Sequence, residues 1–444
     1  MEEIALTPKL ETAQPQPVHA APVSSAERIS SIDVVRGFAL LGIALMNILF
    51  SGLPLAAQFN PNVAGGAHGP NLAAFFLQYI LFDGKMRGLF SLMFGAGSFY
   101  LIQRGLTRGN SVEAVEVYYR RTLWLMLFGA IHAYLIWHGD ILYPYALLGL
   151  VLFPLHSLKP KTLLITAAIF VIAMTGKDIG QGFHLQKIHK TAIEAEQAVK
   201  QGKTLTDDQK SAQKEWDNIR KYISPTPEDL KKEADVYSGS FFHLLEKRAG
   251  IVSEWHSGPF YMSGWDMLTM MLVGIAFAKL AILDASRPTQ FYSKLMLLCY
   301  AIGLPMGTAS AWLAYSQNFE ALQTVFTFST YQAARVAMTI GHLSLLLLIC
   351  KSDWMPALRA RLAAVGQTAF SNYILHSLIY GFLFYGYGFN LYNKLERHQL
   401  YYVVAAMWIV SLIISPIWLR KYRFGPLEWC WRSLTYWQRQ PMAN

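Results

Sequence analysis

Long runs of apolar residues, separated by shorter polar connections, recur along almost the whole chain. The runs are nearly continuous in apolar character, without the strict alternation of a half-buried strand, so they predict helices. A helix of about 20 apolar residues crosses the roughly 30 Å hydrocarbon core of a bilayer. The pattern therefore predicts an all-α polytopic membrane protein, a bundle of about ten transmembrane helices. The predicted spans cover residues 32–53, 86–102, 118–137, 141–156, 162–176, 259–281, 294–315, 331–350, 362–389 and 401–419.

Two further stretches are not expected to span. Residues 71–82 are too short and are predicted to lie in the outer interface. Residues 178–257 are polar, with helix-start signals at Thr206 and Thr226, and predict a helical arm over the outer mouth. The predicted organisation is a disordered cytoplasmic tail (1–28), transmembrane helices one to five (29–177), the extracytoplasmic arm (178–257), transmembrane helices six to ten (258–420) and a cytoplasmic interfacial tail (421–444).

Composition supports the membrane class, and the distribution of charge predicts the orientation. The chain is 53% hydrophobic and 15% charged, whereas a soluble domain carries about a quarter charged residues. The net charge of +10 could suit nucleic acid, but Lys and Arg cluster beside alternate span ends, as the positive-inside rule requires. No nucleic-acid partner is therefore expected, and both termini are predicted to be cytoplasmic. The three cysteines have neither disulfide nor metal spacing, and no metal is expected.

The first span carries a polar stripe formed by Asp33, Arg36 and Asn47. Arg36 and Asn47 are eleven residues apart, roughly three helical turns, so they fall almost on one line. Such a stripe is costly against lipid and is expected to face other helices or a water-filled cavity. One interpretation is that Arg36 snorkels to the inner headgroups while Asn47 bonds a neighbouring helix. The other is that Arg36 binds an anionic group reached from the cytoplasm.

Two histidines in predicted outer connections are candidate bases. His138 lies in a turn with Asp140, which could orient it or accept from an incoming hydroxyl, although an Asp before an apolar run is also an ordinary helix cap. His68 lies in a Gly- and Asn-rich loop whose backbone can approach a ligand closely. A loop histidine of this kind is more often a solvated residue with no function.

Ionisable residues also occur on the later spans. Asp266 and Arg335 both lie near outer span ends and could form an ion pair. His376 shares a helical face with Asn372 and could bridge helices by hydrogen bonds. Their bias toward one side of the bundle suggests a polar cavity that opens outward. The chain has no phosphate-binding-loop, zinc-protease, CxxC or GxSxG motif.

Five segments carry a family resemblance: DVVRGFALLGIALMNI, RGLFSLMFGAGSFY, RRTLWLMLFGAIHAYLIWHGDILYPYALLG, GQTAFSNYILHS and FGPLEWCWRSLTY. In this order they resemble the YeiB-like family of bacterial membrane proteins, domain of unknown function 418. This resemblance implies a multi-pass protein of the bacterial inner membrane.

The first two spans are in turn similar to the transmembrane acyltransferases, which include acyltransferase type 3 proteins and heparan-α-glucosaminide N-acetyltransferases. This resemblance implies transfer of an acyl group from cytoplasmic acyl-CoA to a sugar on the far side. Arg36 matches an Arg of the type 3 branch, but Asn47 stands where that branch has a His and cannot act as a base. In the glucosaminide branch the functional His lies in the next luminal loop, where His68 lies here.

Three function classes follow. As an acyltransferase, the protein would bind acyl-CoA through Arg36, Lys85 and Arg87, use His68 or His138 as base, and stabilise the oxyanion through Asn47. Its acceptor would be an extracytoplasmic glycan, lipid or small molecule. As a transporter or flippase of a small amphiphilic or anionic substrate, it would use a path lined by Arg36, Asp266, Arg335 and His376. A structural or signalling role stays open, as does assembly into a homo-oligomer among membrane lipids.

Overall fold

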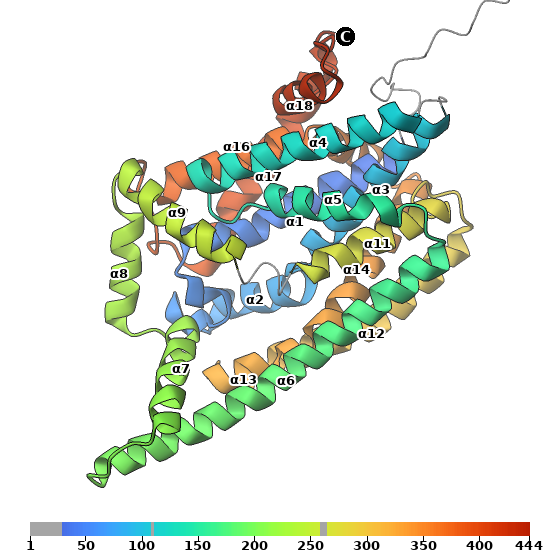
Figure 1. Cartoon of the computed structure of the whole chain (residues 1–444). Helices are drawn as coiled ribbons and strands as arrows, with labels where there is room; N and C mark the ends of the chain where they lie inside the picture. The colour runs from blue at the N-terminus through green and yellow to red at the C-terminus, as the bar shows by residue number, and fades with distance from the viewer. Residues whose placement is uncertain (1–28, 108–110, 258–263) are drawn as a thin grey trace, which may run out of the picture.

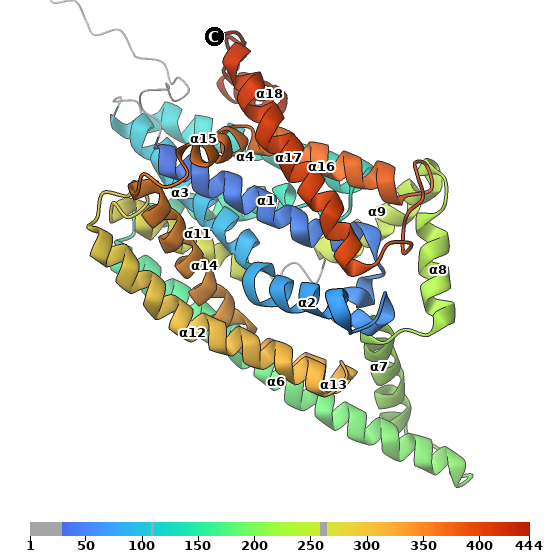
Figure 2. The same ribbon diagram turned by 180° about the vertical axis from the view of Figure 1, so that it is seen from behind.

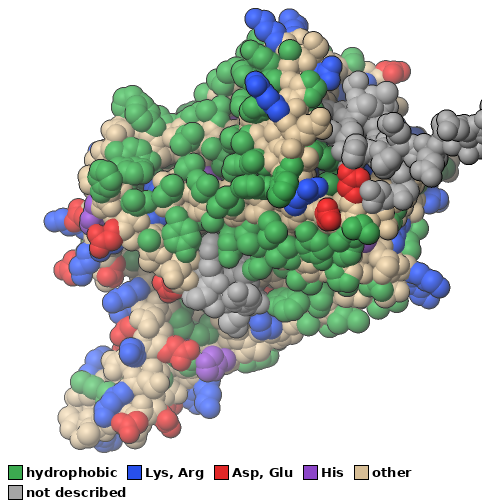
Figure 3. Space-filling model, turned by 45° about the horizontal axis from the view of Figure 1, so that its top comes forward, with side chains coloured by type: hydrophobic (Ala, Val, Ile, Leu, Met, Phe, Trp, Pro, Cys, Tyr) green, Lys and Arg blue, Asp and Glu red, His purple; other side chains and the backbone are tan. Residues whose placement is uncertain are grey.

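The computed structural model describes residues 29–107, 111–257 and 264–444, and these residues are overwhelmingly helical (Figure 1). The predicted disordered tail, 1–28, lies outside the described residues. In the described part of the chain, five helices are long and apolar enough to cross a membrane. On the face in Figure 3, hydrophobic side chains cover the bundle, whereas charged side chains gather on the projecting arm and near the opposite end. The chain is thus an all-α membrane protein.

Within the described residues, each of the ten predicted spans overlaps a helix of the bundle, although residues 259–263 of the sixth span lie outside them and the ninth span covers parts of two helices. Five of these helices meet the length and apolarity of a complete crossing, and α5 and α16 are shorter apolar helices. The bundle helices are α1 (Ser30–Gly52), α3 (Lys85–Thr107), α4 (Ser111–Ile131), α5 (Leu142–Leu155), α6 (Pro160–Lys200), α11 (Trp265–Lys279), α12 (Thr289–Ser316), α14 (Phe328–Lys351), α16 (Ala369–Phe384) and α17 (Arg397–Lys421).

The first helix is the centre of the bundle, and glycines let its neighbours approach it closely. A Cβ on Gly37 of α1 would lie 2.0 Å from the Leu362 carbonyl oxygen of α15 (Pro356–Gln367). A Cβ on Gly366 would likewise lie 2.0 Å from the Asp33 carbonyl oxygen. Small residues allow this backbone contact between membrane helices, which Cβ-bearing residues would prevent. The contact fixes the N-terminal half of α1 against the end of α15.

The ninth predicted span, 362–389, is not one continuous helix. It is divided at Thr368 into α15 and α16, and the Thr368 hydroxyl donates to the Ala364 carbonyl at 2.9 Å. The Glu428 carboxylate accepts the backbone N–H groups of Phe370 (2.7 Å) and Ser371 (3.1 Å), so these donors leave the helical ladder. The second half of the span therefore begins as a new helix with its own cap.

The predicted arm is helical, and Thr206 and Thr226 cap its helices as the sequence predicts. The boundary expected at residue 177 lies inside α6, which continues to Lys200 and packs against α7 in an antiparallel pair (Figure 1). The helix α9 returns along the bundle and packs against η5, a π-helical turn that follows α4. The arm elements are α7 (Asp207–Ile223), α8 (Pro227–Tyr237) and α9 (Phe241–Ser257), and η5 is His132–Ile136.

The remaining elements are short. The stretch 71–82 forms α2 (Gly69–Leu77) and a π-helical turn, η4 (Gln78–Phe82), which together are too short to span. Figure 2 shows α2 on the face opposite to that of Figure 1, and Phe75 packs on Ala311 and Ala314 of α12. The other short elements are η2 (Leu55–Gln58), η3 (Pro61–Val63), α13 (Ala321–Phe326) and α18 (Pro426–Tyr436), the last of which packs on α4 and α16.

Candidate functional site

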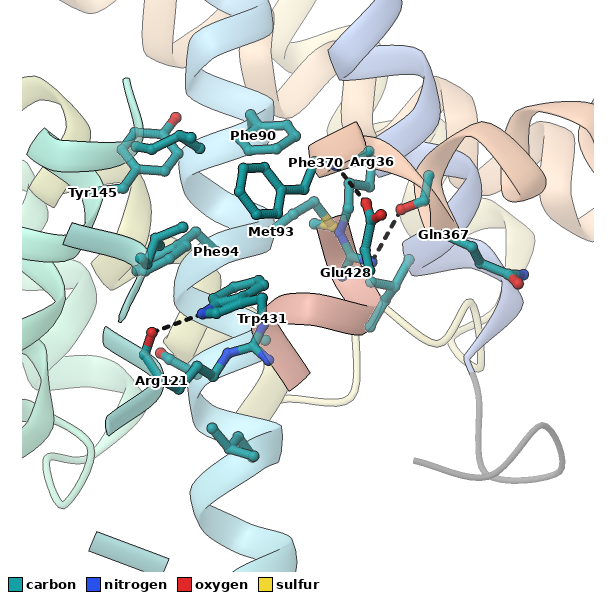
Figure 4. A pocket seen from close by; sticks show the side chains of 18 of the residues that line it. Arg36, Phe90, Met93, Phe94, Arg121, Tyr145, Gln367, Phe370, Glu428 and Trp431 are labelled. Atoms are coloured by element: carbon teal, nitrogen blue, oxygen red, sulfur yellow. Dashed lines mark hydrogen bonds between the residues drawn. The ribbon is translucent and has the colours of Figure 1, made fainter. Parts of the chain in front are cut away.

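A cavity of about 260 Å³ lies among α1, α3, α4, α5, α16 and the C-terminal helix α18 (Figure 4). Four arginines and two carboxylates line it, together with a larger set of aromatic and aliphatic side chains. Three of the arginines come from the N-terminal part of the chain and the fourth from α18. They gather near the start of α1, the end of α3 and the helix α18. The charged lining residues are Asp33, Arg36, Arg104, Arg121, Glu428 and Arg432.

Arg36 reaches this cavity from the first turns of α1. Its Nη1 donates to the Asp33 carboxylate at 3.0 Å and to the Gly366 carbonyl at 3.5 Å. That carbonyl would otherwise pair with the N–H of Phe370, which Glu428 binds instead. A guanidinium has five N–H donors, and the side chain is 29% exposed, so several donors stay open to a ligand.

Arg121 and Trp431 form the wall opposite Arg36 (Figure 4). The Arg121 guanidinium stacks 3.8 Å from the centre of the indole ring, and the indole N–H donates to the Arg121 carbonyl at 2.9 Å. Stacking of this kind fixes a guanidinium without neutralising its charge. The tail, predicted as an interfacial helix, therefore also closes one side of the cavity.

Beyond the arginines the cavity is apolar. Phe90, Met93 and Phe94 project from successive turns of α3 into the space between Arg36 and Tyr145 (Figure 4). Tyr145 is buried and bonds Ser91 through its hydroxyl at 2.8 Å. A cationic end joined to an aromatic interior matches a ligand with an anionic head and an apolar tail.

A buried histidine–aspartate pair lies behind Tyr373, which also lines the cavity. The His132 ring lies 5.0 Å from the Tyr373 ring, and its Nδ1 is 2.7 Å from the Asp140 carboxylate. The second Asp140 oxygen accepts the N–H of Tyr143 at 2.7 Å and thereby caps α5. His132 is 1% exposed and its Nε2 has no hydrogen-bond partner. A carboxylate that holds one ring nitrogen while the other stays open is the arrangement of a general base.

The predicted pairing of His138 with Asp140 is wrong, because Asp140 bonds His132. The π-helical turn η5 brings His132 back toward the start of α5, whereas His138 packs between Trp137 and Tyr237 with ring centres 5.8 and 6.4 Å away. The sequence did not single out His132, because its contact with Asp140, eight residues away, depends on this π-helical turn. The alternative interpretation, Asp140 as a helix cap, is confirmed.

The structure does not bring the remaining predicted catalytic residues to the cavity. His68 is exposed and precedes α2, and its side chain forms no cap hydrogen bond. Asn47 is half-buried on α1, but the α1 residues that line the cavity end at Ile43. The predicted site of Arg36, Asn47 and His68 therefore does not assemble around this cavity.

Lys85 and Arg87 do not line the cavity that holds Arg36. Lys85 is 2% exposed and donates to the Tyr79 carbonyl at 2.6 Å. Arg87 forms an ion pair with Asp266, and Arg335 approaches the same carboxylate oxygen at 3.8 Å. The predicted pair of Asp266 and Arg335 is thus confirmed, while the expectation that Lys85 and Arg87 join Arg36 is not met.

His376 lies apart from this network. Its Nε2 bonds the Ser411 hydroxyl at 3.0 Å, and the Asn372 amide donates to the Ser415 hydroxyl at 3.0 Å. Both contacts join α16 to α17, which is the bridging role that a buried polar residue commonly has in a membrane bundle. Of the residues predicted to line a transport path, Arg36 lines the cavity, whereas Asp266, Arg335 and His376 do not.

The fold shows that the chain is a helical membrane protein. Comparison with known proteins shows the family to which it belongs. The model of a family described as "Protein of unknown function (DUF418)" matches residues 262–438. "Uncharacterized protein YxaH" of Bacillus subtilis (strain 168) is 30% identical over 95% of this chain and 98% of its own length. "Uncharacterized protein YeiB" of Escherichia coli (strain K12) is 30% identical over 92% and 96%. The chain belongs to the DUF418, or YeiB-like, family.

Proposed function

We propose that the protein is a bacterial inner-membrane acyltransferase that takes an acyl group from cytoplasmic acyl-CoA and delivers it to an extracytoplasmic acceptor. The observation that carries this proposal is the cavity, with four arginines at one end and Phe90, Met93 and Phe94 inside. The arginines match the phosphates of the donor, and the aromatic interior matches its acyl chain. The bulk of the nucleotide would remain outside the cavity.

The proposed orientation follows from the same arginines. Arg104, Arg121 and Arg432 lie at or beside the span ends that the positive-inside rule assigns to the cytoplasm. With both termini cytoplasmic, these residues face the compartment that contains acyl-CoA. The arm and the loop of His68 then lie outside the cytoplasm.

His132 is the proposed base, in place of His68 or His138. With Nδ1–H donating to Asp140, Nε2 is an acceptor and can take a proton from the attacking hydroxyl or amine. The acceptor oxygen or nitrogen bonds the thioester carbon, the carbon–sulfur bond breaks, and the proton returns to the departing thiolate. Tyr373 stands between the cavity and this pair, so its ring position would control access to His132.

Binding of acyl-CoA tests the proposal. Purified protein in lipid nanodiscs should bind acyl-CoA, and Arg36→Ala and Arg121→Ala should each weaken binding about tenfold, the loss of roughly one charge-assisted contact. Arg423→Ala is the matched control, because Arg423 is exposed in the same tail region and does not line the cavity. If wild type and Arg36→Ala show the same lack of binding across acyl chain lengths, the proposal fails.

A transporter or flippase is the second candidate, favoured by the ion network of Asp266, Arg87 and Arg335. The Tyr145 hydroxyl donates to the Arg87 carbonyl at 3.2 Å, so the network adjoins the cavity. The same purified protein separates the two functions. An acyltransferase releases free CoA thiol only when an acceptor is present, whereas a transporter moves an anionic amphiphile across a vesicle without releasing thiol.

A further inference from the structure

A serine and a histidine meet at the wall of the cavity that holds Arg36. Ser98 of α3 lines this cavity, and its Oγ lies 3.0 Å from Nε2 of His156, which follows the last residue of α5. Both side chains are buried, with exposed fractions of 8% and 6%. The two residues are 58 positions apart in the chain, so no local motif marks the pair. A serine hydroxyl beside an imidazole is the arrangement of an activated nucleophile.

The backbone fixes the tautomer of His156. Its Nδ1 lies 2.8 Å from the Leu152 carbonyl and 3.2 Å from the Phe153 carbonyl. Because a carbonyl oxygen can only accept, Nδ1 carries the proton, and Nε2 of the neutral ring is then an acceptor. Nε2 can therefore take the proton of the Ser98 hydroxyl, while the Leu152 carbonyl orients the base.

Neighbouring side chains hold the imidazole in place. The Phe99 ring is nearly parallel to it, with an interplanar angle of 4°, and the Tyr118 ring meets it edge-on with centres 5.9 Å apart. The Lys279 ammonium donates to the His156 carbonyl at 2.5 Å and fixes the backbone. A base that is already oriented needs no rearrangement before it accepts a proton.

The Ser98 hydroxyl has one proton and two acceptors within reach. Besides Nε2 of His156, its Oγ lies 2.7 Å from the Gly95 carbonyl of the preceding turn. That carbonyl lies inside α3, where the helical ladder supplies it with a backbone N–H, so it does not depend on the hydroxyl. Rotation of the O–H bond is enough to direct the proton to Nε2. In a purely structural role the same contact would only join α3 to α5, and the reactivity of Ser98 distinguishes the two roles.

Ser98 lies where the apolar and cationic parts of the cavity meet. On α3, Phe94 projects into the apolar interior one turn before Ser98, and Arg104 lines the cavity further toward the end of the helix (Figure 4). A Cβ added to the neighbouring Gly97 would meet no atom within 4 Å, so the space beside Ser98 is open. In a ligand with an anionic head and an apolar acyl tail, the carbonyl between them is therefore expected beside Ser98.

We propose that Ser98 is a nucleophile activated by His156, and that the acyl group passes through an ester on Ser98. The identity of the donor as acyl-CoA rests on the proposed acyltransferase function, whereas the reactivity of Ser98 does not.

The proposed route has two steps. First, Ser98 Oγ bonds the thioester carbon, its proton moves to His156 Nε2, the carbon–sulfur bond breaks, and the departing thiolate takes that proton. Then the acceptor hydroxyl or amine bonds the same carbon, the carbon–Oγ bond breaks, and the acceptor proton returns to Ser98 through His156. In this route His156 takes the place of His132 as the base.

Two kinds of probe test the nucleophile in full-length protein in nanodiscs. An alkyl fluorophosphonate forms a stable Oγ–phosphorus bond with an activated serine as fluoride leaves. Acetyl-CoA or palmitoyl-CoA, supplied without an acceptor, should leave one acyl group per chain on Ser98 and release one equivalent of thiol. Mass spectrometry of the intact protein and of its peptides measures both modifications, and sustained thiol release still requires an acceptor.

Four variants assign the reactivity. Ser98→Ala should abolish both modifications, and His156→Gln, which has no basic nitrogen, should slow them about 100-fold. Ser98→Cys retains a nucleophile; its acyl group would be a thioester that neutral hydroxylamine releases, unlike the wild-type ester. Ser344→Ala is the control, because Ser344 is buried on α14, donates to the Ile340 carbonyl and does not line the cavity.

The outcomes separate the nucleophile from the acyltransferase proposal. Modification of Ser98 by either probe that His156→Gln slows, with the melting temperature retained, supports the pair. Wild-type protein that neither probe modifies at Ser98, or His156→Gln that reacts as fast as wild type, overturns it. If the fluorophosphonate modifies Ser98 while acyl-CoA neither binds nor reacts, the acyltransferase proposal fails and the nucleophile stands. If acyl-CoA binds but neither probe modifies Ser98, the nucleophile fails and direct transfer stands.

Discussion

The cavity beside α18 and the ion network around Asp266 both hold arginines inside the helical bundle, but they differ in how the guanidinium groups are held. In the network, Arg87 and Arg335 converge on one oxygen of the Asp266 carboxylate. In the cavity, Glu428 accepts backbone N–H groups, and the guanidinium of Arg121 is held by stacking on an indole ring. The partner of each guanidinium, rather than its depth in the bundle, therefore distinguishes an arginine that holds helices together from one that is available to a ligand.

The largest expected effect comes from removing the carboxylate that the arginines of the ion network share. Asp266→Asn removes the carboxylate that Arg87 and Arg335 share. Because the Arg87 side chain is 41% exposed and Asp83 also acts on both arginines, we expect the free energy of unfolding to fall by about 3 kcal/mol, the low end for a broken buried pair. Thermal or denaturant unfolding in detergent measures this loss. Asp207→Asn is the control, because Asp207 is fully exposed on the arm and should shift stability by less than about 0.5 kcal/mol. Equal stabilities for the two variants would mean that Asp266 does not hold the network together.

A smaller effect is expected where the backbone positions Arg36. The Cβ of Gly366→Ala would lie 2.0 Å from the Asp33 carbonyl oxygen, so α1 and α15 must separate. We expect a loss of about 1–3 kcal/mol in stability, together with weaker acyl-CoA binding, because Arg36 also contacts the Gly366 carbonyl. In Gly176→Ala the added methyl meets no atom within 4 Å, so this variant should melt no lower than wild type. A Gly366→Ala protein as stable as Gly176→Ala would show that the close contact is not required.

The bundle could be predicted from the sequence because its signals are local. Apolar length identified the helices, and the position of Asp266 and Arg335 near the outer ends of their spans predicted their ion pair. The α15–α16 break was missed because its cause, Glu428, lies 58 residues from Phe370 in the chain. A capping carboxylate at that separation leaves no periodic trace in either segment.

The candidate site could be predicted only in part, because some of its contacts leave no local signal in the sequence. Arg36 stood out because a cation within an apolar span is costly. His132 did not, because its partnership with Asp140 depends on the π-helical turn η5, which apolar periodicity does not reveal. His68 became a candidate base through the resemblance to the glucosaminide branch, yet it is exposed and lies outside the cavity.

The smallest predicted effect is a pH dependence of stability at the edge of the cavity, where Glu428 caps α16. Burial raises the pKa of Glu428, and the hydrogen bonds from Ser371 oppose this only in part. The folded protein then binds the Glu428 proton more tightly than the unfolded chain does. The stability contributed by this proton is present below the ordinary glutamate pKa and is lost as pH rises through the raised value.

Hydrogen exchange of the α18 amides across pH 4 to 8 measures this dependence, and protection of α18 should fall as pH rises. Glu428→Gln, which stays neutral and retains an oxygen for the N–H groups of Phe370 and Ser371, should flatten the profile. Glu194→Gln, on an exposed position of α6, should leave it unchanged. A wild-type profile that rises with pH would mean that the carboxylate form of Glu428 is the one that holds α18, so that Glu428 counts as a compensating charge for the arginines of the cavity.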